Sequence, residues 1–90
     1  MLRITETREN DSLLRLRLDG TLTAESFADL EAAWREGSKQ TTIVILDMAG
    51  VSFMNEPAAR KIAAIKGDRL RIVNCSPFIA ALLETVERSR

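Results

Sequence analysis

Hydrophobic and polar residues alternate in two segments near the amino terminus. In residues 2–5 and again in residues 14–18, every second residue is leucine or isoleucine. Such alternation is typical of a strand with one buried face. The polar segment 8–11 predicts a turn between the two strands, and the pair at 19–20 predicts the end of the second strand. Because this connection is short, we expect the strands to pair in an antiparallel orientation.

The pattern then changes to that of a helix. Phe27, Leu30 and Trp34 recur at spacings of i, i+3 and i+7, which places them on one face of a helix. Thr23 is a good N-cap residue because its hydroxyl can accept a hydrogen bond from a free backbone N–H. Gly37 predicts the carboxyl-terminal end of the helix.

The second half of the chain alternates strands with helices. Residues 42–46 are almost all hydrophobic and β-branched, which predicts a central strand with both faces at least partly covered. We expect a loop over residues 47–55, a short helix over about 57–66 and a strand over 69–73. A last helix is predicted to begin after Ser76, with proline in its first turn.

The predicted order of elements is therefore β-β-α-β-α-β-α. Strands separated by helices favour right-handed crossovers and parallel pairing. We expect an α/β fold with a four-stranded mixed sheet flanked by helices, formed by residues 1–90 as a single domain. Arginine occupies the alternate positions in the first, second and fourth strands, which predicts that one face of the sheet is more exposed than the other.

Charge and composition exclude several classes of partner. Thirteen basic and thirteen acidic residues cancel, so no overall field attracts DNA, RNA or an anionic membrane. No run approaches the roughly 18 apolar residues that a membrane span requires. We expect neither nucleic-acid binding nor membrane insertion. The only cysteine, Cys75, excludes an internal disulfide and fits a protein of the reducing cytoplasm.

Catalytic chemistry has little support in the residue types present. The chain contains no histidine, which removes the commonest general base near neutral pH and the commonest metal ligand. No nucleophile stands beside a base, and no glycine-rich phosphate-binding motif occurs. We therefore expect no enzyme activity, no catalytic residue, no metal and no cofactor.

Three segments resemble the STAS domain family, the fold of bacterial anti-sigma-factor antagonists. They are LDGTL at 18–22, IVILDMAGVSFM at 43–54 and LRIVNCSP at 70–77. The middle segment is the most specific, since it closely resembles the family's central strand and the D-[LM]-[ST]-x-[VL]-x-F-[MI] pattern that continues it. The resemblance covers about residues 2 to 87. It implies a STAS-like fold and a regulatory role in transcription rather than catalysis.

The resemblance also implies where a partner binds. In the family, a D-S-S-G segment follows the central strand, and its first serine opens a helix and is phosphorylated by a partner kinase. This chain reads Asn55-Glu56-Pro57-Ala58 at these positions, so the serine position is occupied by Glu56. None of the four residues has a hydroxyl group, and phosphorylation is not expected there. The expected partner-binding residues are Met54, Asn55, Glu56, Pro57, Ala58 and Lys61.

The role of Glu56 is left open by the sequence. Either Asn55 or Glu56 could simply cap the helix, where a negative charge complements the helix dipole. Alternatively, Glu56 could hold the domain in a state similar to the phosphorylated one, or belong to a distinct partner site. A carboxylate brings less charge than a phosphate, so the mimicry would be incomplete.

The resemblance implies an anti-sigma factor or a serine kinase of the GHKL type as the partner. An alternative is an accessory STAS subunit that binds the ATPase of an ABC transporter, as in lipid-asymmetry systems. A homodimer is a further expectation, because a short helix leaves part of the sheet with less cover. An enzyme would require a pocket that the sequence does not predict.

Overall fold

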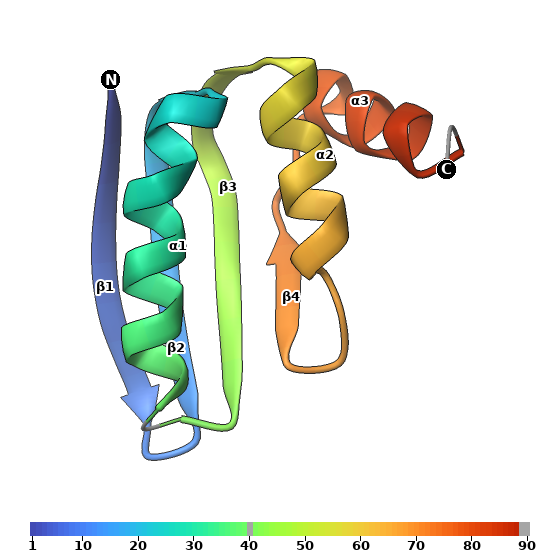
Figure 1. The fold of residues 1–90 in the computed structure, drawn as a ribbon. Helices are drawn as coiled ribbons and strands as arrows, with labels where there is room; N and C mark the ends of the chain where they lie inside the picture. The colour runs from blue at the N-terminus through green and yellow to red at the C-terminus, as the bar shows by residue number, and fades with distance from the viewer. Residues whose placement is uncertain (40, 89–90) are drawn as a thin grey trace.

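The computed structural model describes residues 1–39 and 41–88. Within them, the elements follow the predicted order β-β-α-β-α-β-α (Figure 1). Their bounds are β1 Leu2–Asn10, β2 Leu13–Leu22, α1 Ala24–Ser38, β3 Ile43–Met54, α2 Glu56–Ile65, β4 Leu70–Val73 and α3 Pro77–Arg88. The predicted fold class is therefore confirmed.

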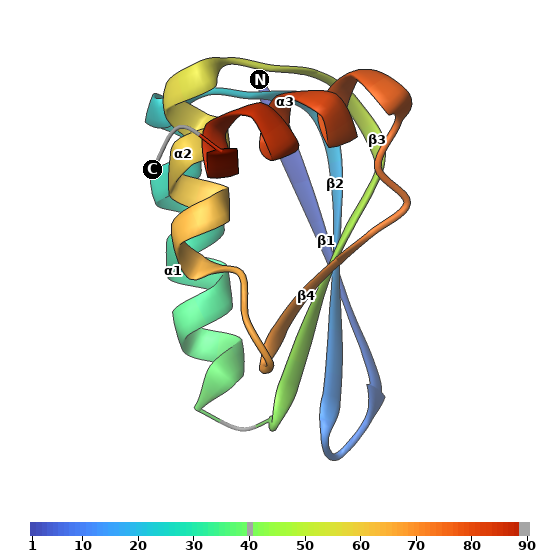
Figure 2. The same cartoon turned by 90° about the vertical axis from the view of Figure 1, so that its right-hand side faces the viewer.

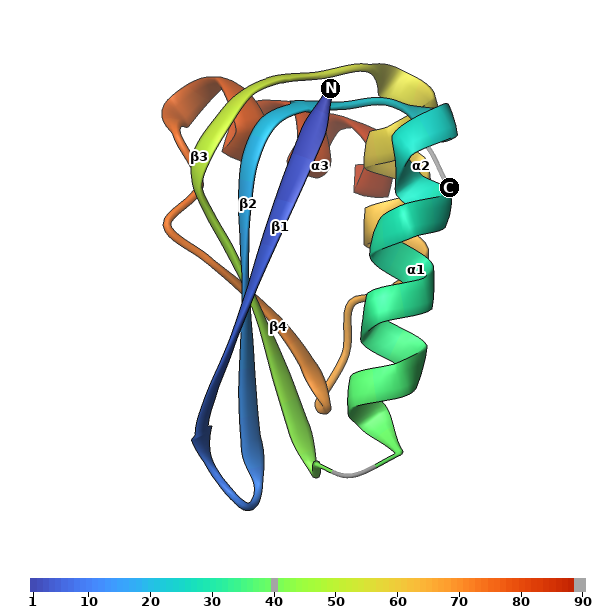
Figure 3. The ribbon, with the colours of Figure 1, turned by 90° about the vertical axis from the view of Figure 1, so that its left-hand side faces the viewer.

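The four strands form one mixed sheet in the order β1-β2-β3-β4. β1 is antiparallel to β2, whereas β2, β3 and β4 are mutually parallel. Figures 2 and 3 show α1 and α2 on one side of the sheet, with α3 crossing near its upper end. Because parallel strands end at the same edge, the carboxyl ends of β2 and β3 lie together near the start of α2.

The hydrophobic core lies between the sheet and the helices. Leu14, Leu16 and Leu18 of β2 are fully buried and face this layer, together with residues of α1, α2 and α3. The alternate residues of the same strand, Arg15 and Arg17, lie on the opposite face and reach solvent. Figure 3 shows that no helix packs over the middle of that face. The alternation of leucine and arginine thus correctly predicts a sheet with one exposed face.

The polar turn predicted at residues 8–11 is wrong, because β1 continues to Asn10. Its polar residues pair with β2 along the sheet edge, where side chains remain in solvent. The turn is tighter and consists of Asp11 and Ser12, where the side-chain oxygen of Asn10 accepts a hydrogen bond from the Ser12 N–H at 2.8 Å. Because the Asn10 side chain makes a hydrogen bond that a backbone carbonyl makes in other turns, two residues suffice to connect the strands.

Most of the loop predicted at residues 47–55 belongs instead to β3, which runs to Met54. β2 also extends beyond Asp19-Gly20, to Leu22, and pairs with this second half of β3. Two register irregularities accommodate the polar and glycine residues there. A neighbouring strand therefore overrides a local sequence that on its own favours a loop.

Thr23 caps α1 as predicted, because its hydroxyl oxygen accepts a hydrogen bond from the Ser26 N–H at 3.4 Å. The role predicted for Gly37 is wrong. Gly37 lies inside α1, which continues to Ser38, and it is buried. A β-carbon at this position would overlap the Leu14 side chain. The residue is glycine because the last turn of α1 packs directly on β2.

Candidate functional site

The candidate site lies where β3 ends and α2 begins. Asn55 is the N-cap residue of α2, and its side-chain oxygen accepts a hydrogen bond from the Ala58 N–H at 3.0 Å. Its backbone N–H donates to the carbonyl of Leu22 at 3.3 Å, which ties the helix start to the end of β2. Pro57 occupies the first turn, where no intrahelical amide partner is needed. The helix start is therefore held firmly to the sheet.

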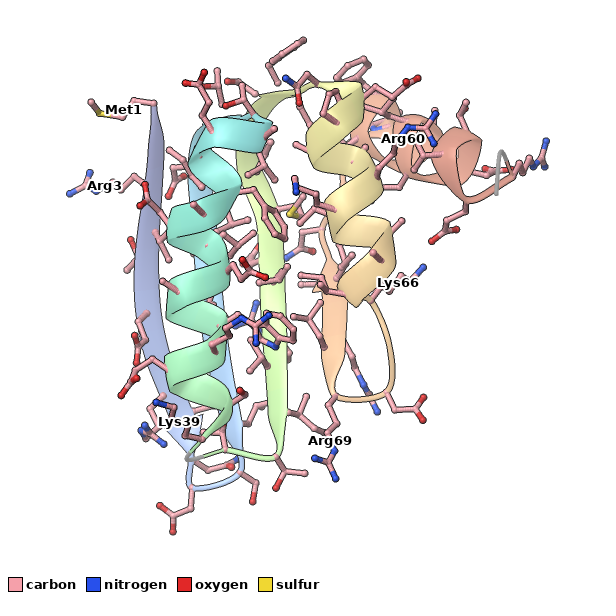
Figure 4. All side chains as sticks on the ribbon, viewed as in Figure 1. Met1, Arg3, Lys39, Arg60, Lys66 and Arg69 are labelled. Atoms are coloured by element: carbon pink, nitrogen blue, oxygen red, sulfur yellow. The ribbon has the colours of Figure 1, made fainter. Side chains whose placement is uncertain are left out.

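Glu56 does not cap the helix. Its side chain is 59% exposed, and its carboxylate lies 3.3 Å from the guanidinium of Arg60, one turn further along α2. Figure 4 shows Arg60 on the outer side of α2. An exposed ion pair of this kind contributes little to stability. Because Asn55 supplies the cap, the Glu56 carboxylate stays on the surface, where it pairs with Arg60.

The other four predicted site residues divide into two groups. Met54 and Ala58 are buried, with exposed fractions of 1% and 0%, so they support the site from the core and are not part of its surface. Pro57 and Lys61 are exposed. The Lys61 amine lies 5.7 Å from the ring centroid of Phe27, so it extends toward α1. Asn55, Glu56, Pro57 and Lys61 therefore form the outer part of the predicted set.

Two aromatic residues beside this set were not predicted. Phe53 at the end of β3 and Phe78 in the first turn of α3 stack with ring centroids 6.3 Å apart. They are 46% and 53% exposed, although large hydrophobic side chains usually seek the core. The sequence signal for Phe78 is its place outside the stripe of Ile79 and Leu83 that faces the core. Exposed, stacked aromatic rings are typical anchors of protein interfaces.

A buried carboxylate connects this region to the sheet. Asp47 is 7% exposed and accepts hydrogen bonds from Asn74 Nδ2 at 3.1 Å, the Ala49 N–H at 3.0 Å and Arg15 Nη1 at 3.1 Å. Burial raises the pKa of Asp47, but the three hydrogen bonds outweigh it and hold the pKa below its ordinary value. Asp47 lies inside β3 and not at its end, contrary to the sequence prediction.

Asn74 forms the other end of this connection. It adopts a φ of 59°, a left-handed conformation that asparagine tolerates better than most residues. The turn that it begins leads to Ser76, whose hydroxyl accepts a hydrogen bond from the Ile79 N–H at 3.3 Å. Ser76 therefore caps α3 as predicted, and the capped first turn carries Phe78. The bond between Asp47 and Asn74 thus helps to place Phe78 beside Phe53.

The site offers contacts for recognition, and its residues form no catalytic arrangement. In the described part of the chain, no group of three acidic or cysteine side chains is arranged to hold a metal ion. The outward groups are a carboxylate, two aromatic rings, a proline and a lysine amine. Within residues 1–39 and 41–88, none of the helices has the length and hydropathy needed to cross a membrane.

These features define a small α/β fold with an outward-facing helix start beside the ends of its parallel strands. The STAS domain family matches residues 5–89, and the chain belongs to that family. A comparison with curated protein sequences found no match.

Two solved structures are similar in fold. The anti-sigma factor antagonist SpoIIAA in its unphosphorylated form matches with a TM-score of 0.64 and 19% identity, over 91% of this chain and 82% of SpoIIAA. An uncharacterised DUF3478-family protein with a SpoIIAA-like fold, from Shewanella loihica PV-4, matches with a TM-score of 0.59 and 15% identity. That match covers 98% of this chain and 78% of the other. At these identities the likeness concerns the fold alone.

Proposed function

We propose that this chain is a non-catalytic regulatory module that binds a partner protein through the junction of β3 and α2. The observation that carries this proposal is the exposed Phe53–Phe78 pair beside the helix start that Asn55 caps. The two half-exposed rings offer an apolar anchor, and the exposed Glu56–Arg60 pair at the helix start offers a charged contact. This combination is typical of a protein interface.

The proposed partner is an anti-sigma factor or a related serine kinase in the cytoplasm of a bacterium. Membership of the STAS family and the likeness to SpoIIAA support this choice. Glu56 stands at the position of the family's phosphorylated serine and keeps a negative charge there. Phosphorylation of residues 55–58 is chemically excluded, because none of them has a hydroxyl group. This module would therefore bind its partner without being switched at that position.

Two measurements test the proposal. Incubation of the purified chain with a candidate kinase and ATP should leave residues 55–58 without phosphate, as read by mass spectrometry. Affinity capture from the native host should then compare the wild type with Glu56→Ser and Glu56→Ala. Equal capture by all three would mean that the carboxylate contributes nothing to recognition.

The aromatic pair provides a second arm of the capture experiment. Phe53→Ala and Phe78→Ala should each weaken partner binding about 5- to 30-fold, which is the effect of an interface residue worth about 1–2 kcal/mol. Arg3→Ala, at an exposed position of β1 that β2 separates from Phe53, is the control and should bind as the wild type does. Unchanged binding by both Phe variants would refute the proposed surface. Capture of a transporter ATPase in place of an anti-sigma factor would favour the transporter role.

A further inference from the structure

The outer edge of β4 carries backbone N–H and C=O groups that form no hydrogen bond with another strand. The Val44 N–H donates to the Arg69 carbonyl at 2.8 Å, and Val44 is paired with Leu70. In a parallel ladder this register directs the backbone of residues 69, 71 and 73 toward β3, and that of Leu70 and Ile72 away from it. The Leu70 carbonyl accepts a hydrogen bond from the Gly67 N–H at 3.1 Å. The N–H and C=O of Ile72 have no backbone partner among the described residues.

This edge is also open in space. β4 is the last strand of the sheet on this side. Figure 2 looks onto the edge, and no strand or helix runs along β4 in that view. An unpaired edge strand is a template for a further strand, because its N–H and C=O groups can continue the ladder.

A pocket of about 290 Å³ lies against the same edge. Ile72 and Cys75 line it from the side of β4, and Ala80 and Leu83 line it from α3. Burial raises the pKa of the Cys75 thiol, so this side of the pocket is uncharged. This volume lies at the lower limit of about 300 Å³ for ligand pockets, and it leaves room for one side chain.

Charges at the rim of the pocket are already paired. The Lys66 amine lies 3.4 Å from the Glu87 carboxylate, and Arg88 pairs with Glu84. Figure 4 shows Lys66 at the lower end of α2. The paired charges at the rim therefore cancel, and Ile72, Ala80 and Leu83 supply the aliphatic part of the lining.

The exposed face of the sheet beside β4 is basic. Arg71 pairs with Ile45 in the β3–β4 register, which places its side chain on the face away from the helices. Arg71 and Arg69 are exposed, and neither has an ion pair within the described residues. Figure 4 shows Arg69 directed away from the sheet. A strand added here would carry every second side chain past Arg71, where acidic groups are favoured.

We propose that the β4 edge binds an extended segment of a partner protein as a fifth strand. Its backbone would pair with Ile72, one aliphatic side chain would enter the pocket, and the acidic side chains on either side would face Arg71. Backbone pairing and a pocket for alternate side chains are the two components of strand addition. No residue that lines the pocket belongs to the set at the β3–α2 junction or to the Phe53–Phe78 pair, so variants of the two sets can be compared.

Two synthetic peptides test the proposal directly. Both are blocked at their ends; one has the sequence Glu-Ile-Glu-Leu-Glu and the other Lys-Ile-Lys-Leu-Lys. Titration into the ¹⁵N-labelled chain should shift the amide signals of Ile72 and of the pocket residues with the acidic peptide. The basic peptide should bind about two- to fivefold more weakly, because each exposed charge pair contributes only modestly. Shifts confined to Phe53 and Phe78 would overturn the proposal.

Matched variants locate the binding more sharply. Ala80→Leu places a larger side chain at the mouth of the pocket, whereas Ala81→Leu changes the adjacent exposed position, which does not line it. We expect at least about fivefold weaker acidic-peptide binding for the first variant and no change for the second, since leucine is well tolerated in helices. Equal binding by the two variants would overturn the proposal.

Charge and backbone variants complete the test. Arg71→Glu should abolish the preference for the acidic peptide, whereas Arg3→Glu on the opposite edge strand should keep it. Ile72→Pro removes the outward N–H without touching the β3 ladder, and it should weaken binding of both peptides. Sedimentation tests whether the free chain forms a dimer and whether Ile72→Pro abolishes it. If both are observed, a second copy of the chain occupies the edge, and the proposal is overturned.

Discussion

Asp47 provides the strongest stability test of the structure. Asp47→Ala removes the acceptor for the Ala49 N–H, for the Asn74 side chain and for Arg15. The Arg15 guanidinium is open to water and also bonds to Glu9 at 3.0 Å. Loss of its bond to Asp47 should therefore change the free energy of unfolding little. The other two hydrogen bonds end on a buried carboxylate, and each contributes about 1–1.5 kcal/mol. We expect a loss of about 2–3 kcal/mol in the free energy of unfolding.

A more conservative variant separates charge from hydrogen bonding. Asp47→Asn keeps the oxygen that accepts from both the Ala49 N–H and the Asn74 side chain but places an amide group beside Arg15. We expect a smaller loss, about 1–2 kcal/mol. Urea unfolding followed by Trp34 fluorescence and by circular dichroism measures both losses, and an unchanged m-value would show that two-state unfolding is preserved. Asp68→Asn, an exposed carboxylate in the α2–β4 turn, is the control and should leave the midpoint unchanged.

The same network predicts a pH dependence. The pKa of Asp47 is lower in the folded protein than the value of about 4 expected in the unfolded chain. A lowered carboxyl pKa contributes stability above that unfolded value, and the contribution is lost as the pH falls through the folded-state pKa. The stability difference between wild type and Asp47→Asn should be complete at pH 7 and should shrink below about pH 4. A difference that stays constant from pH 7 to pH 3 would refute the assigned role of the carboxylate.

Two further predictions concern glycine packing and helix capping. Gly37→Ala should destabilise the fold by about 1–3 kcal/mol despite alanine's better helix propensity, because its β-carbon meets the Leu14 side chain. Gly67→Ala is the matched control, since its β-carbon would meet no atom within 4 Å, and calorimetry should show an unchanged or slightly higher melting temperature. Asn55→Ala should cost about 1 kcal/mol in urea unfolding, whereas Asn55→Asp keeps the capping oxygen and should stay near wild type; equal losses for both would contradict the capping role.

Elements with a strong local pattern could be predicted from the sequence. The alternation of leucine and arginine in β2 fixes both the strand and its buried face, since a shift of one residue would bury Arg15 and Arg17. The three-residue and four-residue spacing in α1 likewise requires a helix, and Thr23 marks its start. In these segments the local preference and the final packing agree, so a single sequence suffices.

The second half of β3 shows where such reasoning fails. Asp47 and Gly50 are poor strand residues, and together they favour a loop. The chain stays extended there because β2 continues beside it as far as Leu22. The site also changes through this effect, because Met54 becomes the last residue of a strand and is buried. Contacts between segments that are distant in the sequence keep this part of the chain extended, and no local sequence pattern predicts those contacts.

The surface of the candidate site depends on such a distant contact even more strongly. Phe53 and Phe78 are 25 positions apart in the sequence, and only Phe78 has a local signal for the surface, its place outside the core-facing stripe of α3. They meet at the surface because α3 begins three residues after a left-handed residue, Asn74, that is bonded to Asp47. Loss of that bond should therefore loosen the aromatic pair as well as the fold. Asp47→Ala, which removes the acceptor for the Asn74 amide, should move the ring signals of Phe53 and Phe78 toward values for separate rings, although it touches neither residue; unchanged ring signals would show that α3 is placed by core packing alone.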